Sequence, residues 1–353
     1  MRRWGSINDM IIEEATLSRE RPDTFATTVR LQSDPTYAAR ARVLPIPDML
    51  PTSRYRLRDE LSIFYLVLQA LFREKVLLIN ACRGRFKPEL IVTTLAGFLP
   101  RYLRPKIVLY GDFFQPSENN ILGKLERFVM RLADRSTNAY VFITEAERGV
   151  FARTWRVPKE KTYVCPYFIE RKRHSSPASQ EVGRHIFSGG NSFRDYEPIL
   201  EAARHLPDHQ FVLCTSALND RTDIPKNVHA GLVSHQEYVQ LINSAAAIVI
   251  PLQTGLKRIA GLQTAFDSMW LKKPTIITDA LGVREYLTDD ETGLIVDGSP
   301  GSYREAIAWV MDPGNETAVA TMCQKAHDTV GQYTLEKHVH HLLAVMDKIM
   351  RED

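Results

Sequence analysis

The sequence predicts an α/β protein built from two consecutive Rossmann-like domains. Through most of the chain, short apolar runs alternate with segments of helical periodicity, which is the pattern of βα units on parallel sheets. The chain has 353 residues, 44% of them apolar and 25% charged, so it is long enough for two soluble domains. A polar stretch at residues 170–183, which carries Ser, Pro and Gly and has no periodicity, predicts the linker between them.

The first domain is predicted at residues 1–170. Prolines interrupt residues 1–55, where we expect at most two short strands, near residues 27–31 and 42–44. Four apolar runs predict further strands, and three longer periodic segments predict helices between them. These strands are expected at residues 76–81, 106–110, 140–144 and 162–165, and the helices at residues 61–73, 89–102 and 122–132.

The second domain is predicted at residues 171–333, and its pattern is more regular. Residues 334–353 follow it, with one amphipathic helix at residues 334–350. The expected strands lie at residues 185–188, 210–214, 228–230, 247–251, 275–278 and 293–296. The expected helices lie at residues 196–205, 234–243, 263–271 and 283–287.

Cysteine usage and the N-terminal residues predict a cytoplasmic protein. Cys82, Cys165, Cys214 and Cys323 lie far apart and form no Cys-x-x-Cys pair, so neither a disulfide framework nor a zinc site is indicated. The first twenty residues are acidic where a secretory leader needs an apolar core. The most apolar stretch, residues 61–72, is shorter than the roughly twenty residues of a spanning helix. We therefore expect a cytoplasmic location, extending to peripheral attachment at the inner face of the membrane.

The charge of the chain is unevenly distributed. Residues 1–175 contain 30 Lys and Arg against 19 Asp and Glu, whereas the remainder contains 15 against 23. A basic half predicts an anionic partner, either a membrane surface or nucleic acid. Residues 98–106 (FLPRYLRPK) interleave cations with aromatic and aliphatic side chains, a mixture that suits anionic lipid headgroups. An ordinary basic loop between a helix and a strand explains this segment equally well.

The strand expected at residues 185–188 ends in a candidate phosphate loop. Gly189 and Gly190 follow it, and Ser192 and Arg194 come next. Paired glycines let a ligand approach the backbone closely, and a guanidinium can bind phosphate through two parallel hydrogen bonds. A tight turn, with Arg194 paired to Asp195 or to water, is the structural alternative.

A second candidate loop follows the strand expected at residues 247–251. It contains Lys257, Arg258 and Gly261 and leads into a helix that begins with Gln263 and Thr264. A helix N-terminus offers free N–H groups and a partial positive charge to a diphosphate. Asp267 lies one turn into that helix, where its carboxylate could accept hydrogen bonds from a ribose diol or simply favour the first helical turn.

Several short motifs between residues 135 and 300 together indicate a family. They are DSM (267–269), KPTIITD (273–279), Gly282, TGLIV (292–296), SGG (188–190) with RDY (194–196), VFITE (141–145), VP (157–158) and KTYVCP (161–166). They resemble the donor-binding half and the interdomain region of family 4-like GT-B glycosyltransferases.

The resemblance implies the GT-B fold, with two Rossmann-like domains facing across a cleft and a C-terminal helix that crosses back to the N-terminal domain. It also implies a hexosyltransferase of cell-envelope polysaccharide biosynthesis. Such an enzyme takes a UDP- or GDP-sugar as donor, without a separate cofactor, and a lipid-linked or glycan acceptor.

The same family pattern assigns the site residues. Gly261, Gln263 and Thr264 would cradle the diphosphate, Arg194 with Lys257 or Arg258 would neutralise it, Asp267 would hold the ribose, and Gly189, Gly190 and Ser192 would complete the donor loop.

The sequence departs from the family pattern at two places. Retaining members carry two glutamates eight positions apart, whereas this chain has Ile259 and Asp267 at the corresponding positions. The glycine-rich loop that usually follows the first strand is not evident either. The first departure affects the expected sugar preference, and the second affects the acceptor pocket.

For the mechanism, we expect a transfer that needs no metal ion, because no Asp-x-Asp motif follows any predicted strand. Cations and helix dipoles would stabilise the leaving nucleoside diphosphate, with Arg194 and Lys257 as the main cations. The resemblance favours retention of configuration by a modest margin. If the reaction inverts, a carboxylate must accept the acceptor's proton. Asp112, at the end of the strand expected at residues 106–110, is then the candidate, and Glu118 is a weaker one.

Two other functions remain open at this level. A GT-B nucleotide-sugar epimerase would act on a free sugar nucleotide and needs several acid and base groups in the N-terminal domain. A catalytically silent GT-B scaffold that binds another glycosyltransferase would explain the missing glutamate, but it has no use for a charged diphosphate pocket. No nucleic-acid recognition motif is present, so we do not expect a nucleic-acid partner.

Overall fold

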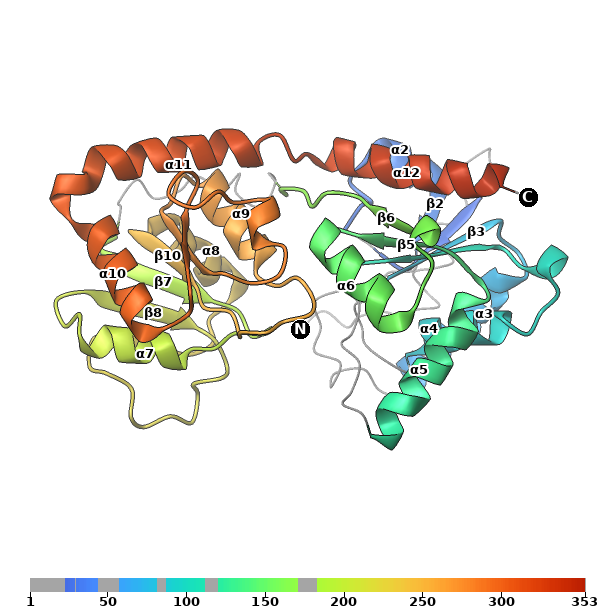
Figure 1. The fold of residues 1–353 in the computed structure, drawn as a ribbon, viewed down its shortest axis with the longest axis horizontal. Helices are drawn as coiled ribbons and strands as arrows, with labels where there is room; N and C mark the ends of the chain where they lie inside the picture. The colour runs from blue at the N-terminus through green and yellow to red at the C-terminus, as the bar shows by residue number, and fades with distance from the viewer. Residues whose placement is uncertain are drawn as a thin grey trace. The chain divides into compact units, whose positions relative to one another are not determined.

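Each half of the chain folds around a parallel sheet of six strands (Figure 1). The computed structural model describes residues 23–28, 30–43, 57–80, 87–111, 120–170 and 183–352. Within them, the residues up to Ile143, Phe151–Cys165 and the residues from Val339 onward form unit 1. Thr144–Val150 and Pro166–His338 form unit 2.

The sheet of unit 1 has the strand order β2-β1-β3-β4-β5-β6. The strand expected near residues 27–31 lies earlier in the structure, because the polar Thr27 and Thr28 already follow the carboxyl end of β1. The other strand predictions for this half are confirmed to within a few residues. The strands are β1 (Thr24–Ala26), β2 (Ala41–Val43), β3 (Val76–Asn80), β4 (Lys106–Tyr110), β5 (Thr137–Phe142) and β6 (Thr162–Val164).

Helices α3 (Leu57–Leu71), α4 (Pro88–Ala96) and α5 (Ile121–Asp134) connect these strands. The helix expected at residues 89–102 ends earlier, at Ala96. A Cβ atom at the next residue, Gly97, would lie 2.6 Å from the carbonyl oxygen of Leu132 on α5. The close approach of α4 to α5 therefore requires glycine there. A separate 3-10 turn follows at Arg101–Leu103.

Two helices of the first half were not predicted. Helix α2 (Pro35–Arg40) is short, and the Asp34 side chain caps it by accepting hydrogen bonds from the N–H groups of Thr36 and Tyr37. Helix α6 (Glu145–Trp155) follows β5. Its first turn is capped by Glu285, whose carboxylate accepts hydrogen bonds of 2.8 Å from the N–H groups of Glu145 and Ala146.

The sheet of unit 2 has the order β12-β11-β10-β7-β8-β9, and all its strand predictions are confirmed to within one residue. The strands are β7 (His185–Gly189), β8 (Gln210–Cys214), β9 (Val228–Ala230), β10 (Ala247–Ile250), β11 (Thr275–Thr278) and β12 (Leu294–Val296). Their apolar residues form one core with α7 (Glu197–Arg204) and α10 (Pro300–Met311).

The expected helices of unit 2 are present as α7, α8 (His235–Ser244) and α9 (Leu262–Trp270). The segment expected as a helix at residues 283–287 is a single 3-10 turn, Val283–Glu285. Helix α10 and helix α11 (Glu316–Val330) were not predicted. Among the described residues, no helix combines the length and the apolar character of a membrane span.

The last helix, α12 (Leu335–Arg351), belongs to both units, because the residues from Val339 onward pack in unit 1. There Asp347 accepts a hydrogen bond of 2.7 Å from Arg40, and the Lys348 ammonium lies 5.0 Å from the centre of the Tyr163 ring. Leu342, Met346 and Ile349 are buried on its inner side. The C-terminal helix that returns to the N-terminal half is therefore confirmed (Figure 1).

Candidate functional site

The strand order of unit 2 locates a ligand site. The chain passes from β7 to β8 and β9 on one side of the sheet and then returns to β10 on the other side of β7 (Figure 1). Open parallel sheets bind ligands outside the carboxyl ends of their strands, at the point where the order reverses. The loops after β7 and β10 flank that point, and they are the two loops that the sequence singled out.

The loop after β7 requires both of its glycines. A Cβ atom on Gly189 would lie 2.6 Å from the Tyr238 ring. Gly190 has φ of +119°, and a Cβ atom there would lie 3.2 Å from Nη2 of Arg194. Close contacts exclude a side chain at both positions, and the backbone conformation also disfavours one at Gly190. The Arg194 guanidinium can therefore lie against the bare backbone of Gly190.

Arg194 is a half-buried cation with unused hydrogen-bonding capacity. Its Nη1 donates to the Ser192 carbonyl at 3.1 Å, and its Nη2 donates to Thr264 Oγ1 at the long distance of 3.4 Å. Its Nε is buried and makes no hydrogen bond, and in the described part of the chain no carboxylate forms an ion pair with it. Burial lowers the pKa of Arg194, because loss of water disfavours the charged form. Buried donors are normally hydrogen-bonded, and an anion at this place would supply the partner that Arg194 Nε lacks.

Hydrogen bonds hold the loop after β7 against its neighbours. The side-chain oxygen of Asn191 accepts hydrogen bonds from Thr215 Oγ1 and the Ser216 N–H, both at 2.8 Å, in the loop after β8. On the other side, the Gln253 N–H donates to the Phe193 carbonyl at 3.0 Å, in the loop after β10. The three loops at this end of the sheet are thus joined through residues 191–193.

The loop after β10 brings two further predicted groups to this place. The guanidinium carbon of Arg258 lies 4.9 Å from the centre of the Phe193 ring. Phe193 directly precedes Arg194 in the sequence. Gly261, with φ of +80°, is the N-cap of α9 and provides no capping side chain. The first N–H groups of α9 are therefore available to a ligand beside Arg194 and Thr264.

Gln263 and Asp267 lie in the first turns of α9, and their side chains contact each other. Tyr167 Oη donates a hydrogen bond of 2.8 Å to Gln263 Oε1, and Gln263 Nε2 donates one of 3.1 Å to Asp267 Oδ1. Asp267 is buried. Because the Gln263 side chain is engaged in this chain of hydrogen bonds, its backbone N–H is the group that remains for a phosphate.

Of the remaining predicted site residues, only Lys257 lies within the described part of the chain. Lys257 is exposed, and in the described part of the chain it forms neither a hydrogen bond nor an ion pair. Asp112 and Glu118 lie outside the described residues. No group of three His, Cys, Asp or Glu side chains with metal-binding spacing occurs among the residues that the structure describes.

Three tyrosines lie beside Arg194, and only Tyr196 belongs to a motif that the sequence marked. Tyr196, Tyr238 and Tyr303 each interact electrostatically with its guanidinium. Tyr196 Oη donates to the Gly190 carbonyl at 2.7 Å, and the Tyr303 hydroxyl lies 2.6 Å from Thr278 Oγ1. Burial raises the pKa of Tyr238 and of Tyr303 to about 12. Tyr196 closes the RDY motif that begins at Arg194, whereas no local pattern marks the other two.

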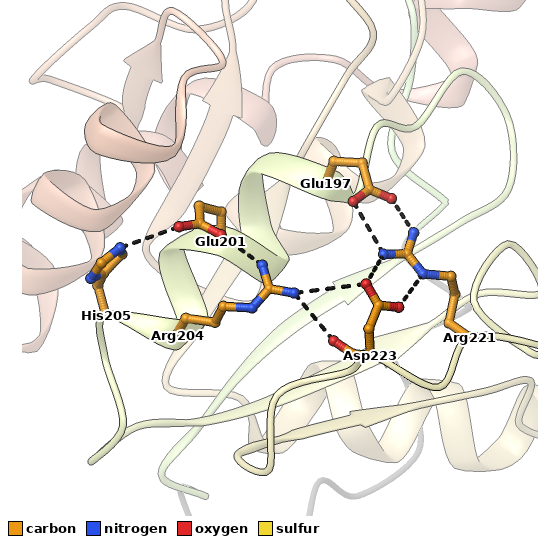
Figure 2. Close-up of polar contacts among 6 residues, drawn as sticks. All are labelled: Glu197, Glu201, Arg204, His205, Arg221 and Asp223. Carbon is orange, nitrogen blue, oxygen red and sulfur yellow. Dashed lines mark hydrogen bonds and ion pairs between the residues drawn. The ribbon is translucent and has the colours of Figure 1, made fainter.

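An exposed network of charges holds a further segment next to the loop after β7. Figure 2 shows Arg221 between Glu197, at the start of α7, and Asp223. Arg204, near the end of α7, donates to the Asp223 carbonyl at 3.2 Å and to Glu201 at 2.6 Å. Hydrogen bonds from Arg221 lower the pKa of Asp223 to about 2. The network ties residues 221–223 to α7, and salt weakens such exposed pairs.

The structure is similar to crystal structures of glycosyltransferases. HepE from Anabaena, crystallised with UDP, superposes with a TM-score of 0.68 at 14% identity, over 92% of this chain and 99% of HepE. A glycosyltransferase from Rickettsia africae gives 0.62 at 11% identity, over 94% and 90% of the two chains. Sucrose-phosphate synthase from Thermosynechococcus elongatus gives 0.64 at 13% identity, over 94% and 100%. No protein-family model and no curated protein matches the chain. The likeness confirms the predicted GT-B fold.

Proposed function

We propose that this protein is a glycosyltransferase that takes its sugar from a nucleoside diphosphate-sugar. The observation that carries this proposal is the Arg194 guanidinium, half-buried at the reversal point of the sheet and without a carboxylate partner in the described part of the chain. The uncapped start of α9 lies beside it. A cation and a helix N-terminus directed at one place suit a diphosphate. Support comes from the GT-B neighbours, among which HepE was crystallised with UDP and with UDP-glucose.

In the proposed reaction, the site stabilises the leaving nucleoside diphosphate. As the sugar–phosphate bond breaks, negative charge grows on the diphosphate, where Arg194 and the N–H groups of Gly261, Gln263 and Thr264 would meet it. Arg258 beside Phe193 adds a second cation, and Lys257 is proposed to join them when the donor binds. Gly189, Gly190 and Ser192 would line the phosphate, and Asp267 would hold the ribose. Groups positioned in advance for a developing charge are the strongest source of rate enhancement in such sites.

The finer features of the reaction remain part of the proposal. We propose retention of configuration, without a metal ion, and a lipid-linked or glycan acceptor. The motifs of residues 251–298 support retention. The excess of basic residues in the first half supports an acceptor at an anionic surface. Asp112 would serve as base only in an inverting reaction.

Calorimetric titration with UDP, GDP and ADP, without added metal ion, tests the proposal. We expect one nucleotide to bind, which names the donor base. Arg194→Ala should weaken its binding about tenfold or more, because a hydrogen-bonded charge contact contributes roughly 1.5–3 kcal/mol. Arg153→Ala is the matched control, since it removes an exposed arginine near the end of α6, in unit 1, and it should leave binding unchanged.

Two results would contradict the proposal. If no nucleotide binds the wild-type protein, the chain is a GT-B scaffold rather than a transferase. If a nucleotide binds equally well to wild type and Arg194→Ala, the diphosphate lies elsewhere. A nucleotide that binds as expected leads to the next assay, in which turnover of the matching sugar nucleotide is followed by NMR at the anomeric carbon.

A further inference from the structure

Three neighbouring helices of unit 1 carry apolar residues on their outer sides. On α5, Ile121, Leu125 and Phe128 follow one another at helical spacing and are exposed, Ile121 by 87% and Phe128 by 56%. On α4, Ile91 and Leu95 continue into Phe98 just beyond the helix, again at intervals of three or four residues. On α3, Leu61 and Tyr65 are four residues apart, and Phe72 follows seven residues later, just beyond the helix. Soluble helices usually place polar residues there.

These three stripes belong to one surface. Helix α4 lies beside α3 and beside α5 (Figure 1). The inner sides of the three helices share a single core on one face of the sheet, with Ile63 from α3, Ala96 from α4 and Met130 from α5. Because their inner sides face the same core, their outer sides face the same way. The surface formed by the outer sides of α3, α4 and α5, together with the turn Arg101–Leu103, is called the three-helix face below.

The exposed charges of α4, α5 and the turn between them are all positive. Among the described residues 88–111 and 120–135, the exposed charged side chains are Arg101, Lys124, Arg131 and Arg135. The acidic residues of the same segments are withdrawn from the surface. Glu89 and Glu126 are buried, and Asp134 binds Lys161 at 3.1 Å.

Arg104 lies close to two of these cations, Arg101 and Arg135. Its guanidinium donates to the carbonyl groups of Gly97, Leu99 and Arg135 and thereby fixes the turn to the ends of α4 and α5. Burial, and then the charges of Arg101 and Arg135, lower the pKa of Arg104. The positive charge here is therefore not neutralised within the described part of this surface.

We propose that the three-helix face docks on the surface of an anionic lipid bilayer. Ile121, Leu125, Phe128 and Phe98 would enter the headgroup region, while Lys124, Arg131 and Arg101 would contact lipid phosphates. In the described parts of α4, α5 and the turn between them, the exposed apolar side chains are accompanied by exposed cations. This is the composition of a helix that lies in the membrane interface. The expectation from residues 98–106 thus becomes one part of a larger surface, which the structure assembles from helices far apart in sequence.

Other occupants fit this surface less well. In a symmetric dimer the same patch meets itself, so the cations Arg101, Lys124, Arg131 and Arg135 of one copy would be brought against the equally basic patch of the other. Nucleic acid would engage the cations, but its backbone offers nothing to cover exposed isoleucine and leucine side chains. Patches of this kind are uncommon on proteins that stay monomeric in water.

The test is co-sedimentation with lipid vesicles, which does not depend on the proposed transfer reaction. We expect wild type to bind vesicles that contain about one-third phosphatidylglycerol. Its affinity for vesicles of pure phosphatidylcholine should be lower by about tenfold or more. Two double variants separate the contributions. Ile121→Ser with Phe128→Ser removes apolar contact, and Lys124→Glu with Arg131→Glu reverses two charges. Each should weaken binding to anionic vesicles by about tenfold or more.

The matched control is Leu232→Ser with Lys337→Glu, which makes the same kinds of change at exposed positions of unit 2. It should bind vesicles as wild type does. All these substitutions are at exposed positions, so thermal unfolding should be unchanged, and nucleotide titration of the variants should match wild type. Failure of the vesicle assay and failure of nucleotide binding are therefore distinguishable.

Three outcomes would overturn the proposal. Wild type could fail to bind anionic vesicles. The serine variant could bind them as tightly as wild type, which would mean that the apolar stripes do not enter the bilayer. The protein could also form a dimer that the serine variant dissociates in size-exclusion chromatography, which would assign the face to a second copy.

Discussion

Arg194 is the residue on which the proposed donor site depends. Its position against Gly190 follows from two consecutive glycines, and its guanidinium is left with a buried Nε that makes no hydrogen bond. A lysine at this position would carry the same charge but could not present two parallel N–H groups to a phosphate. Charge alone is therefore insufficient here, and the planar fork of arginine is the specific requirement.

The tyrosines beside Arg194 give the protein a defined response to alkaline pH. A phenol whose pKa is higher in the folded than in the unfolded chain stabilises the fold fully below the unfolded value, near 10.0. The contribution is lost as the pH rises through the folded value, about 12 for Tyr238 and Tyr303. We expect the free energy of unfolding to fall across this window, and to fall less steeply in a Tyr238→Phe, Tyr303→Phe variant.

Urea denaturation at several pH values between about 9 and 12 measures this effect. Tyr65→Phe is the control, since Tyr65 is exposed by 59%, and it should follow the wild-type profile. Equal slopes for wild type and the double variant would show that the two buried phenols do not contribute.

At the scale of elements, Gly282 allows the start of the 3-10 turn Val283–Glu285 to pack closely against Thr144 and Ile259. Gly282 has φ of +78°, and a Cβ atom there would lie 2.9 Å from Thr144 Cγ2 and 3.0 Å from Ile259 Cδ1. We expect Gly282→Ala to destabilise the protein by about 2–4 kcal/mol, because backbone strain and overpacking add.

Gly301, in the first turn of α10, is the matched control for Gly282. Its Cβ position has no atom within 4 Å, and its φ lies outside the left-handed region. Gly301→Ala should stabilise the protein by about 0.5–1 kcal/mol, because alanine restricts the unfolded chain. Urea denaturation of both variants gives the comparison. A loss of stability in both, or in neither, would contradict this account of the turn.

The elements also show what local sequence could predict. The strands of unit 2 were found to within one residue, because buried parallel strands are short, continuous apolar runs. Helix α11 was missed, since its buried side has one long apolar side chain, Met322, beside the smaller Cys323, Ala326 and Val330, and this gives a weak helical period. Helix α2 was missed because six residues are too few for periodicity.

In the candidate site too, the residues that are close together in the sequence could be predicted, and those that come from distant elements could not. Gly189, Gly190 and Arg194 are close in sequence, so a local pattern could mark them. Tyr238 and Tyr303 arrive from distant helices, and nothing near them in the sequence indicates Arg194. The side-chain hydrogen bond from Tyr167 to Gln263 joins residues far apart in the chain, so the sequence assigned the Gln263 side chain no partner.

At the scale of the molecule, the two halves share one architecture and differ in surface chemistry. Both sheets are parallel and six-stranded. Unit 2 has the loops that suit a nucleoside diphosphate, whereas unit 1 has the three-helix face with its exposed cations. The uneven charge of the sequence therefore corresponds to a division of labour, with the donor proposed for one unit and the membrane for the other.

Hydrogen–deuterium exchange with and without saturating nucleotide tests the central claim most directly, since the claim concerns where the diphosphate binds. Backbone N–H groups that bind phosphate exchange more slowly. We expect slower exchange in peptides covering residues 186–196 and 259–266, and unchanged exchange in residues 97–105 of unit 1. Slower exchange confined to unit 1, or none in either loop at saturation, would contradict a donor site at Arg194 and the start of α9.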